Sequence, residues 1–180
     1  MINKTWYRVH RHRTNSAGFT ASELLNGITT GATATTRIGR KINLKSLYLR
    51  YTVGLTASST GGCQFRILVV YDKQTNGNTA TITDILLSDD FKAPNNLSYR
   101  DRFVDLVDEV TDPVSVQNNY QLAGIIYRKI NLEQMFNAGT AGDITDITTG
   151  SILVFCAQSG GVGTGAPLFD FTSRIRFTDI

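Results

Sequence analysis

The residues best suited to chemistry are concentrated in the first thirteen positions of the chain. Three arginines are interleaved there with aromatic and imidazole side chains: Trp6, Tyr7, Arg8, His10, Arg11, His12 and Arg13. Arginine pairs with phosphate oxygens, and aromatic rings stack on unpaired bases. The pattern predicts contact with single-stranded nucleic acid. The alternative is a segment that is merely solvated, or that docks Trp6 and Tyr7 on a neighbouring subunit.

Catalytic patterns are lacking elsewhere in the sequence. His10 and His12 are the only histidines, so His-based proton transfer has no candidate in the rest of the chain. The sequence contains no G-x-S-x-G, no P-loop and no H-E-x-x-H motif. A His-x-His pair alone offers two ligands, which is too few for a stable metal site. We therefore expect no enzyme activity, no metal and no cofactor.

Acidic residues gather in the middle of the chain, at Asp89, Asp90, Asp101, Asp105, Asp108, Glu109 and Asp112. One interpretation is a divalent-cation site between loops or subunits. The other, which we favour, is solvated strand faces and salt bridges to Arg100 and Arg102.

Charge is distributed unevenly along the 180 residues. The formal net charge is +3, but residues 1–50 hold nine basic residues and one acidic residue, a net +8, and the rest of the chain is net −5. A basic leader of this kind predicts a polyanionic partner, and charge alone is equally compatible with a soluble domain that has an incidental basic tail. No apolar run approaches the roughly 18 residues of a membrane span, and Met1 to Trp6 lack the apolar stretch of a signal peptide. Cys63 and Cys156 form neither a zinc spacing nor a disulfide framework, so we expect them to be reduced, inside a cell or a virion.

The first 36 residues are predicted to form a basic N-terminal arm with a short helix and a linker. Thr20 and Glu23 have capping-box spacing, which predicts a helix over 21–26 that stops at Gly27. Residues 26–36 are rich in Gly, Thr and Ala and are typical of a linker.

Residues 37–180 are predicted to form a second unit, built mainly of strands with alternating apolar positions. The expected strands are 42–55, 64–72, 102–110, 122–132, 151–158 and 170–178. Ile42 and Leu44 are out of phase with Leu47 and Leu49, which predicts a bulge near Lys45 and Ser46. In the last strand, Ile175 and Phe177 should face the core. Short helices are expected over 83–91 and 132–137. The unequal connections favour an all-β, eight-stranded antiparallel jelly-roll sandwich (Greek key) with one to three short helices.

Several segments in order resemble the jelly-roll capsid proteins of small circular single-stranded DNA viruses, and equally the coat protein of satellite tobacco necrosis virus and its relatives. The segment from Arg37 to Arg50 resembles the first jelly-roll strand of these capsids. Further likenesses are Phe65 to Gly77, Thr83 to Leu86, Arg102 to Asp108 and Ser173 to Asp179.

The resemblance implies a coat protein of a virion, assembled in the host nucleus or cytoplasm as sixty identical subunits around a single-stranded genome, with DNA expected. The expected nucleic-acid contacts are Lys4, Arg8, Arg11, Arg13, Arg37, Arg40 and Lys41. The partners would be copies of the same chain and nucleic acid bound without sequence specificity, with no membrane. A monomeric jelly-roll module that binds carbohydrate or nucleic acid remains the alternative. Size-exclusion chromatography separates it from a shell.

Overall fold

The computed structural model describes residues 3–13, 19, 22–54, 64–111, 121–159 and 168–180. Within these ranges the chain forms strands, one short α-helix and two 3-10 helices. The strands are β1 (Asn3–Arg13), β2 (Glu23–Leu24), β3 (Lys41–Gly54), β4 (Phe65–Asp72), β5 (Phe103–Thr111), β6 (Gln121–Phe136), β7 (Ile147–Thr149), β8 (Ser151–Gln158) and β9 (Leu168–Asp179). The helices are α1 (Ile82–Ile85), η1 (Leu97–Tyr99) and η2 (Ile144–Asp146).

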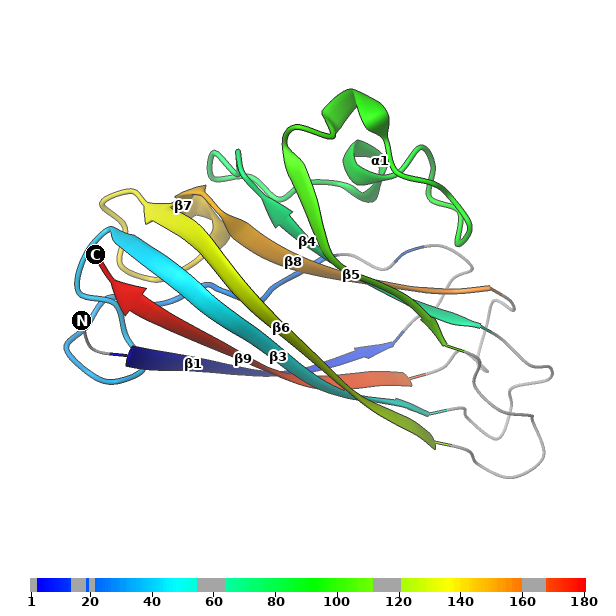
Figure 1. Cartoon of the computed structure of the whole chain (residues 1–180), viewed down its shortest axis with the longest axis horizontal. Helices are drawn as coiled ribbons and strands as arrows, with labels where there is room; N and C mark the ends of the chain where they lie inside the picture. The colour runs from blue at the N-terminus through cyan, green and yellow to red at the C-terminus, as the bar shows by residue number, and fades with distance from the viewer. Residues whose placement is uncertain (1–2, 14–18, 20–21, 55–63, 112–120, 160–167) are drawn as a thin grey trace.

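The strands form two antiparallel sheets, which face each other in Figure 1. Sheet 1 has the order β1-β9-β3-β6-β7, and sheet 2 has the order β2-β8-β4-β5. Early strands pair with late ones: β1 with β9, β2 with β8, β3 with β6 and β4 with β5. A long hairpin rolled into two facing sheets gives this order, so the predicted all-β jelly-roll is confirmed. The short β7 is an addition to its eight strands.

Between the sheets lies the main hydrophobic core. The inward positions of β3 and β9 are those that the alternation predicted: Leu47, Leu49, Tyr51, Val53, Phe169, Phe171, Ile175 and Phe177 are all buried. The Phe65 ring of β4 lies 5.0 Å, centroid to centroid, from the Phe169 ring of β9, so aromatic contact ties sheet 2 to sheet 1.

Sheet 2 is covered on its second face as well. Leu68 and Val70 of β4 and Phe155 of β8 form a separate buried cluster with Leu86 and Phe91, which belong to the connection between β4 and β5. Every residue of β4 is buried, as its apolar sequence predicted.

The predicted irregularity in β3 is present. The pairing of β3 with both β6 and β9 shifts register between Leu44 and Ser46. The shift lets Ile42 and Leu44 point inward together with Leu47, despite their different sequence phase.

Two helix predictions are wrong, and a third is right in kind but not in its bounds. Residues 21–26 hold β2, because Glu23 and Leu24 pair with Val154 and Leu153 of β8. Residues 132–137 continue β6 up to Phe136 instead of turning into a helix. The helix expected over 83–91 covers only Ile82–Ile85, with Thr81 as its N-cap.

The prediction that the first 36 residues form an arm is corrected for the segment that the structure describes as β1. Asn3 to Arg13 form β1 and pair with β9 over their whole length. The segment from Arg37 to Arg50 therefore contains the third jelly-roll strand, not the first.

Residues 26–36, expected to be a linker, are hydrogen-bonded to the body of the protein. Asn26 donates its side-chain amide to the carbonyl oxygen of Gly150 and accepts from the Ile152 amide. A Cβ atom on Gly27 would lie 2.2 Å from the carbonyl oxygen of Gly142, so this glycine allows a close backbone approach rather than stopping a helix.

Candidate nucleic-acid interface

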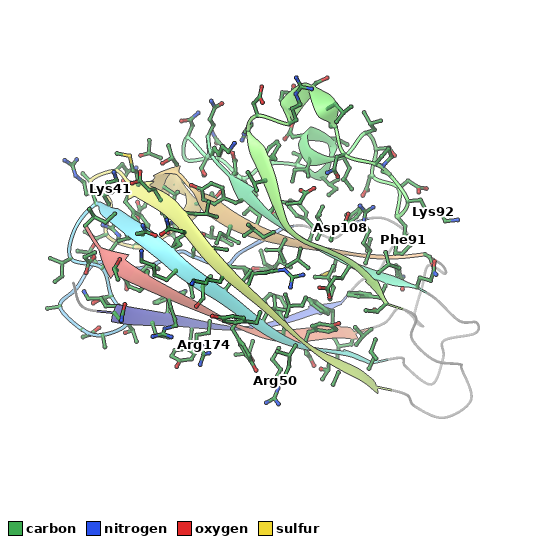
Figure 2. The ribbon with its side chains drawn as sticks, viewed as in Figure 1. Lys41, Arg50, Phe91, Lys92, Asp108 and Arg174 are labelled. Atoms are coloured by element: carbon green, nitrogen blue, oxygen red, sulfur yellow. The ribbon has the colours of Figure 1, made fainter. Side chains whose placement is uncertain are left out.

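The outward face of sheet 1 carries a group of basic and aromatic side chains that are exposed or half-buried. Successive side chains of a strand point to opposite faces, so the buried odd positions of β3 and β9 leave Tyr48, Arg50, Arg174 and Arg176 on the outside. Figure 2 shows Arg50 and Arg174 on the side of sheet 1 that faces away from sheet 2.

Strand register places these side chains in rows across the sheet. One row runs through Tyr7 of β1, Arg174 of β9, Tyr48 of β3 and Tyr127 of β6. The next row includes Arg176, Ser46 and Lys129, and the row on the other side includes Thr172, Arg50 and Ile125. We call Tyr7, Tyr48, Arg50, Tyr127, Lys129, Arg174 and Arg176 together the basic face.

Among the residues that the structure describes, none neutralises the cations of the basic face. Arg50, Lys129, Arg174 and Arg176 form no ion pair with any described residue. The Arg174 guanidinium lies 4.9 Å from the centre of the Tyr48 ring, a cation–π contact. The face therefore offers positive charge to an external anion, with aromatic rings beside it.

Of the residues predicted from sequence, Lys4 is engaged inside the protein. Its side chain is 4% exposed. The ammonium group lies 2.7 Å from the Asp179 carboxylate and donates a 2.8 Å hydrogen bond to the carbonyl oxygen of Thr36. These contacts join the ends of β1 and β9 to the segment before β3.

Arg37 is likewise a structural residue, with 2% of its surface exposed. Its guanidinium donates to the carbonyl oxygens of Ile28 at 3.0 Å, Gly39 at 2.9 Å and Gly139 at 2.6 Å. It also lies 3.9 Å from the centre of the Phe136 ring. Burial lowers the pKa of Arg37 from its usual value, and the carboxylates of Asp146 and Asp179 oppose that shift.

The remaining predicted contact residues lie at the surface before and at the start of β3, or along β1. Arg40 is exposed just before β3. Lys41 pairs with Glu133 of β6 at 3.0 Å, and both side chains are largely exposed, so the pair contributes little stability. Arg8, Arg11 and Arg13 are opposite Ser173, Asp170 and Leu168 of β9 in the backbone register, and their side chains lie outside the described residues.

Sequence reasoning missed most of the basic face. The even positions of Arg174 and Arg176 were visible in the last strand, but their alignment with Tyr48 and Tyr127 depends on pairing between distant strands. A signal for this face was present in the sequence, because the residues that alternate with the apolar ones in each predicted strand point away from the core.

The acidic residues of the middle segment lie around sheet 2, and several are paired. Arg66 binds Asp108 through two hydrogen bonds of 2.7 and 2.8 Å, and Arg128 of β6 reaches Glu109 at 3.0 Å. Arg102, expected to pair with this cluster, instead contacts the buried Asp72 at 2.8 Å. Residues 64–111 hold eight acidic and five basic residues, so this layer is net negative.

A shallow pocket lies beside the Arg66–Asp108 pair, near Phe91 and Lys92 (Figure 2). The guanidinium of Arg66 also donates to the carbonyl oxygens of Phe91 and Ala93. Its nitrogens are thus already engaged, which leaves few donors for a ligand. Within the described ranges no three metal-ligating side chains gather, and no helix has the length and apolar character needed to cross a membrane.

Comparison with known proteins identifies the family. The model of the satellite tobacco necrosis virus coat protein family matches residues 3–180, so the chain belongs to this family of coat proteins. A relative is the coat protein of Maize white line mosaic satellite virus, 30% identical over 145 residues. That match covers 79% of this chain and 65% of the relative, so the chain spans under two thirds of the length of that protein.

Two solved virus structures also align with the chain. They are the infectious bursal disease virus Gx strain, at 9% identity and TM-score 0.31, and the T13 IBDV viral particle, at 10% identity and TM-score 0.27. Each alignment covers 99% of this chain, and respectively 33% and 36% of the other chain. At these TM-scores neither likeness carries an argument.

Proposed function

We propose that this chain is a coat protein whose copies assemble into a small icosahedral shell of sixty identical subunits and enclose a single-stranded nucleic acid. Membership of a coat protein family supports the first part. The observation that carries the second is the basic face, where cations without ion-pair partners among the described residues share a sheet face with the exposed rings of Tyr7 and Tyr127. Its place is the virion, and its activity is assembly and packaging rather than catalysis.

The two layers of the sandwich differ in charge, which supports one orientation in the shell. The basic face of sheet 1 carries four cations, whereas the layer formed by residues 64–111 is net −3. A subunit with sheet 1 toward the interior attracts nucleic acid inside the shell and repels it outside. With sixty copies, the basic face alone supplies about 240 positive charges, enough for about 240 phosphates.

Fewer residues of the N-terminal part are proposed to contact nucleic acid than the sequence suggested. Arg8, Arg11, Arg13, Arg40 and Lys41 remain proposed contacts. Lys4 and Arg37 are removed from the set, because their cationic groups are buried and hydrogen-bonded to the protein's own carbonyl oxygens.

The first experiment tests packaging by paired substitutions that change net charge equally. Particles of Arg50→Gln/Lys129→Gln should form and contain less nucleic acid, seen as a lower 260/280 nm absorbance ratio. The control Lys92→Gln/Arg100→Gln removes two exposed cations from the sheet 2 layer and should leave the ratio unchanged. Equal ratios in all three proteins would refute an inward basic face. Electron microscopy of the wild type should show uniform shells, and monomers across a broad buffer screen would refute assembly.

The chemical nature of the genome is a separate part of the proposal. Capsids of DNA and RNA viruses share the strand pattern of this chain, so the pattern does not decide between them, and DNA stands as our proposal. Digestion of nucleic acid extracted from particles by DNase I, but not by RNase A, is the expected result, and the reverse pattern would assign RNA.

A monomeric carbohydrate-binding module is the second candidate, favoured by one observation. Such modules need exposed aromatic rings on a sheet face, and Tyr7 and Tyr127 provide two of them in one row. The arginines and lysine around these rings favour a polyanion over a neutral sugar. A single peak near 20 kDa in size-exclusion chromatography at every salt concentration, with binding to neutral glycans, would select this candidate.

A further inference from the structure

The three tyrosines of the basic face lie in one row that crosses four strands of sheet 1. Tyr7, Tyr48 and Tyr127 share the row with Arg174. Neighbouring strands are about 4.8 Å apart, so the row spans three such steps, or about 14 Å. Tyr7 is 56% exposed and Tyr127 54% exposed, so their rings are open to an external ligand.

Cations flank this row on both sides. Arg50 is two residues after Tyr48, Arg176 two after Arg174, and Lys129 two after Tyr127. Residues i and i+2 of a strand point to the same face, at a separation of about 6.8 Å along the strand. Arg50 therefore lies on one side of the ring row, and Arg176 and Lys129 lie on the other side.

We propose that Tyr7 and Tyr127, the two exposed rings of this row, form a stacking platform for unpaired bases, with Arg50, Arg176 and Lys129 holding the phosphates on either side. Tyr48, between them, is half-buried under the Arg174 guanidinium and supports that cation. This inference rests on the proposed packaging function and names its selectivity. An aromatic ring can stack on a base only when that base exposes its face, and paired bases inside a duplex do not. The basic face therefore selects single strands over duplexes, which charge alone would not do.

Stacking and charge leave different signatures in binding data. Phosphate contacts release counterions, so each one adds about 0.7 to the dependence of log K on log salt for a single strand. A stacked base contributes affinity without changing that slope. Tyrosine and arginine substitutions on the same face can thus be separated by salt titration.

The experiment measures fluorescence anisotropy of the full chain with a labelled 12-nucleotide oligothymidylate and with a 12-base-pair duplex, each over a salt series. Wild type should bind the single strand more tightly than the duplex at equal salt. Tyr127→Ser should weaken single-strand binding about fivefold or more, with an unchanged salt slope and unchanged duplex binding. Tyr127→Phe keeps the ring and should match wild type. Arg50→Gln should weaken both ligands and lower the single-strand slope by about 0.7.

Tyr7→Ser and Tyr7→Phe repeat the test on another strand, so a fold defect in one variant does not decide the result. The platform is refuted if Ser variants bind the single strand as well as wild type, or lose duplex binding to the same extent. It is also refuted if Phe variants fail like Ser variants, because that outcome assigns the hydroxyl group. If the Ser variants lose as much affinity for a heparin fragment as for the single strand, the basic face is a polysaccharide-binding surface and the platform is refuted.

Failure of the platform and failure of packaging give different results. Oligonucleotide binding is measured on unassembled subunits, where the basic face is accessible, so the result does not depend on shell formation. Shells whose 260/280 nm ratio depends on Arg50 and Lys129, combined with tyrosine variants that bind normally, would retain packaging and remove stacking. Tyrosine-dependent single-strand binding without shells would retain stacking and remove assembly.

Discussion

Arg37 gives the sharpest test of the difference between a cation that binds nucleic acid and one that holds the fold together. The change is Arg37→Met, which keeps much of the side-chain volume and removes the guanidinium. Three carbonyl oxygens, of Ile28, Gly39 and Gly139, then lose their donor. The bond to Ile28 is buried, and a buried acceptor left without a partner costs about 1–3 kcal/mol. The bonds to Gly39 and Gly139 are partly buried, so losing them costs less, and the contact with Phe136 contributes up to about 2 kcal/mol. Because the desolvation of the guanidinium is recovered, we expect a net loss of about 3–5 kcal/mol.

A loss of this size is a large part of the 5–15 kcal/mol by which domains are typically stable. The assay is urea unfolding of unassembled subunits, followed by the fluorescence of Trp6, the single tryptophan of the chain. Arg40→Met is the matched control, because Arg40 is exposed three residues away, and it should shift stability by no more than about 0.5 kcal/mol. If Arg37→Met unfolds like wild type and binds oligonucleotide more weakly, then Arg37 is a nucleic-acid contact and the structural argument is wrong.

Three further predictions concern the core and the first strand. Phe177→Ala should destabilise the subunit by about 3–5 kcal/mol in urea unfolding, because Phe177 is fully buried between the sheets; a loss below 1 kcal/mol would contradict its place in the core. Deleting residues 1–13 should yield aggregated protein in size-exclusion chromatography, since it uncovers the edge of β9; a soluble, assembly-competent product would show that β1 is dispensable. Burial raises the pKa of the Cys156 thiol, so in a Cys63→Ser background this thiol should react with Ellman's reagent at pH 8 only after unfolding. Because the thiol of the unfolded chain ionises first, the free energy of unfolding should fall as the pH rises above about 8.5. Fast reaction of the native protein would refute the burial of Cys156.

The parts of the fold that the sequence predicted well are those where local alternation and burial coincide. β3 and β9 show this: each has an apolar set at every second residue, and these sets face the other sheet. The bulge near Lys45 was predictable because it changes the phase of the same pattern.

Where local signals and long-range pairing compete, pairing prevails. The capping-box spacing of Thr20 and Glu23 predicted a helix, yet Glu23 and Leu24 pair with β8 as β2, and Leu25 is fully buried beside them. A two-residue strand has too few positions to show a period, so no inspection of the sequence alone reveals it.

The candidate site was predictable in its chemistry but not in its location. Arginines next to aromatic rings suggested nucleic acid, and the basic face has that composition. The residues of the basic face differ from the predicted contact residues, because a charged residue in a sequence gives no information on whether its side chain is buried. Lys4 and Arg37 belong to the basic leader, yet both satisfy carbonyl oxygens inside the protein. Arg174 lies near the other end of the chain and shares a row with Tyr7.

The position of β1 links folding to the proposed packaging surface. Tyr7 belongs to the basic face, while Lys4, three residues earlier on the same strand, is buried and joined to Asp179 of β9. Loss of the strand would therefore remove part of the nucleic-acid surface and, at the same time, the partner of β9. A truncation that abolishes packaging cannot by itself show that the first thirteen residues bind the genome. Substitutions confined to exposed side chains such as Tyr7 and Tyr127 separate the two effects, because they leave the backbone pairing and the buried ion pair in place.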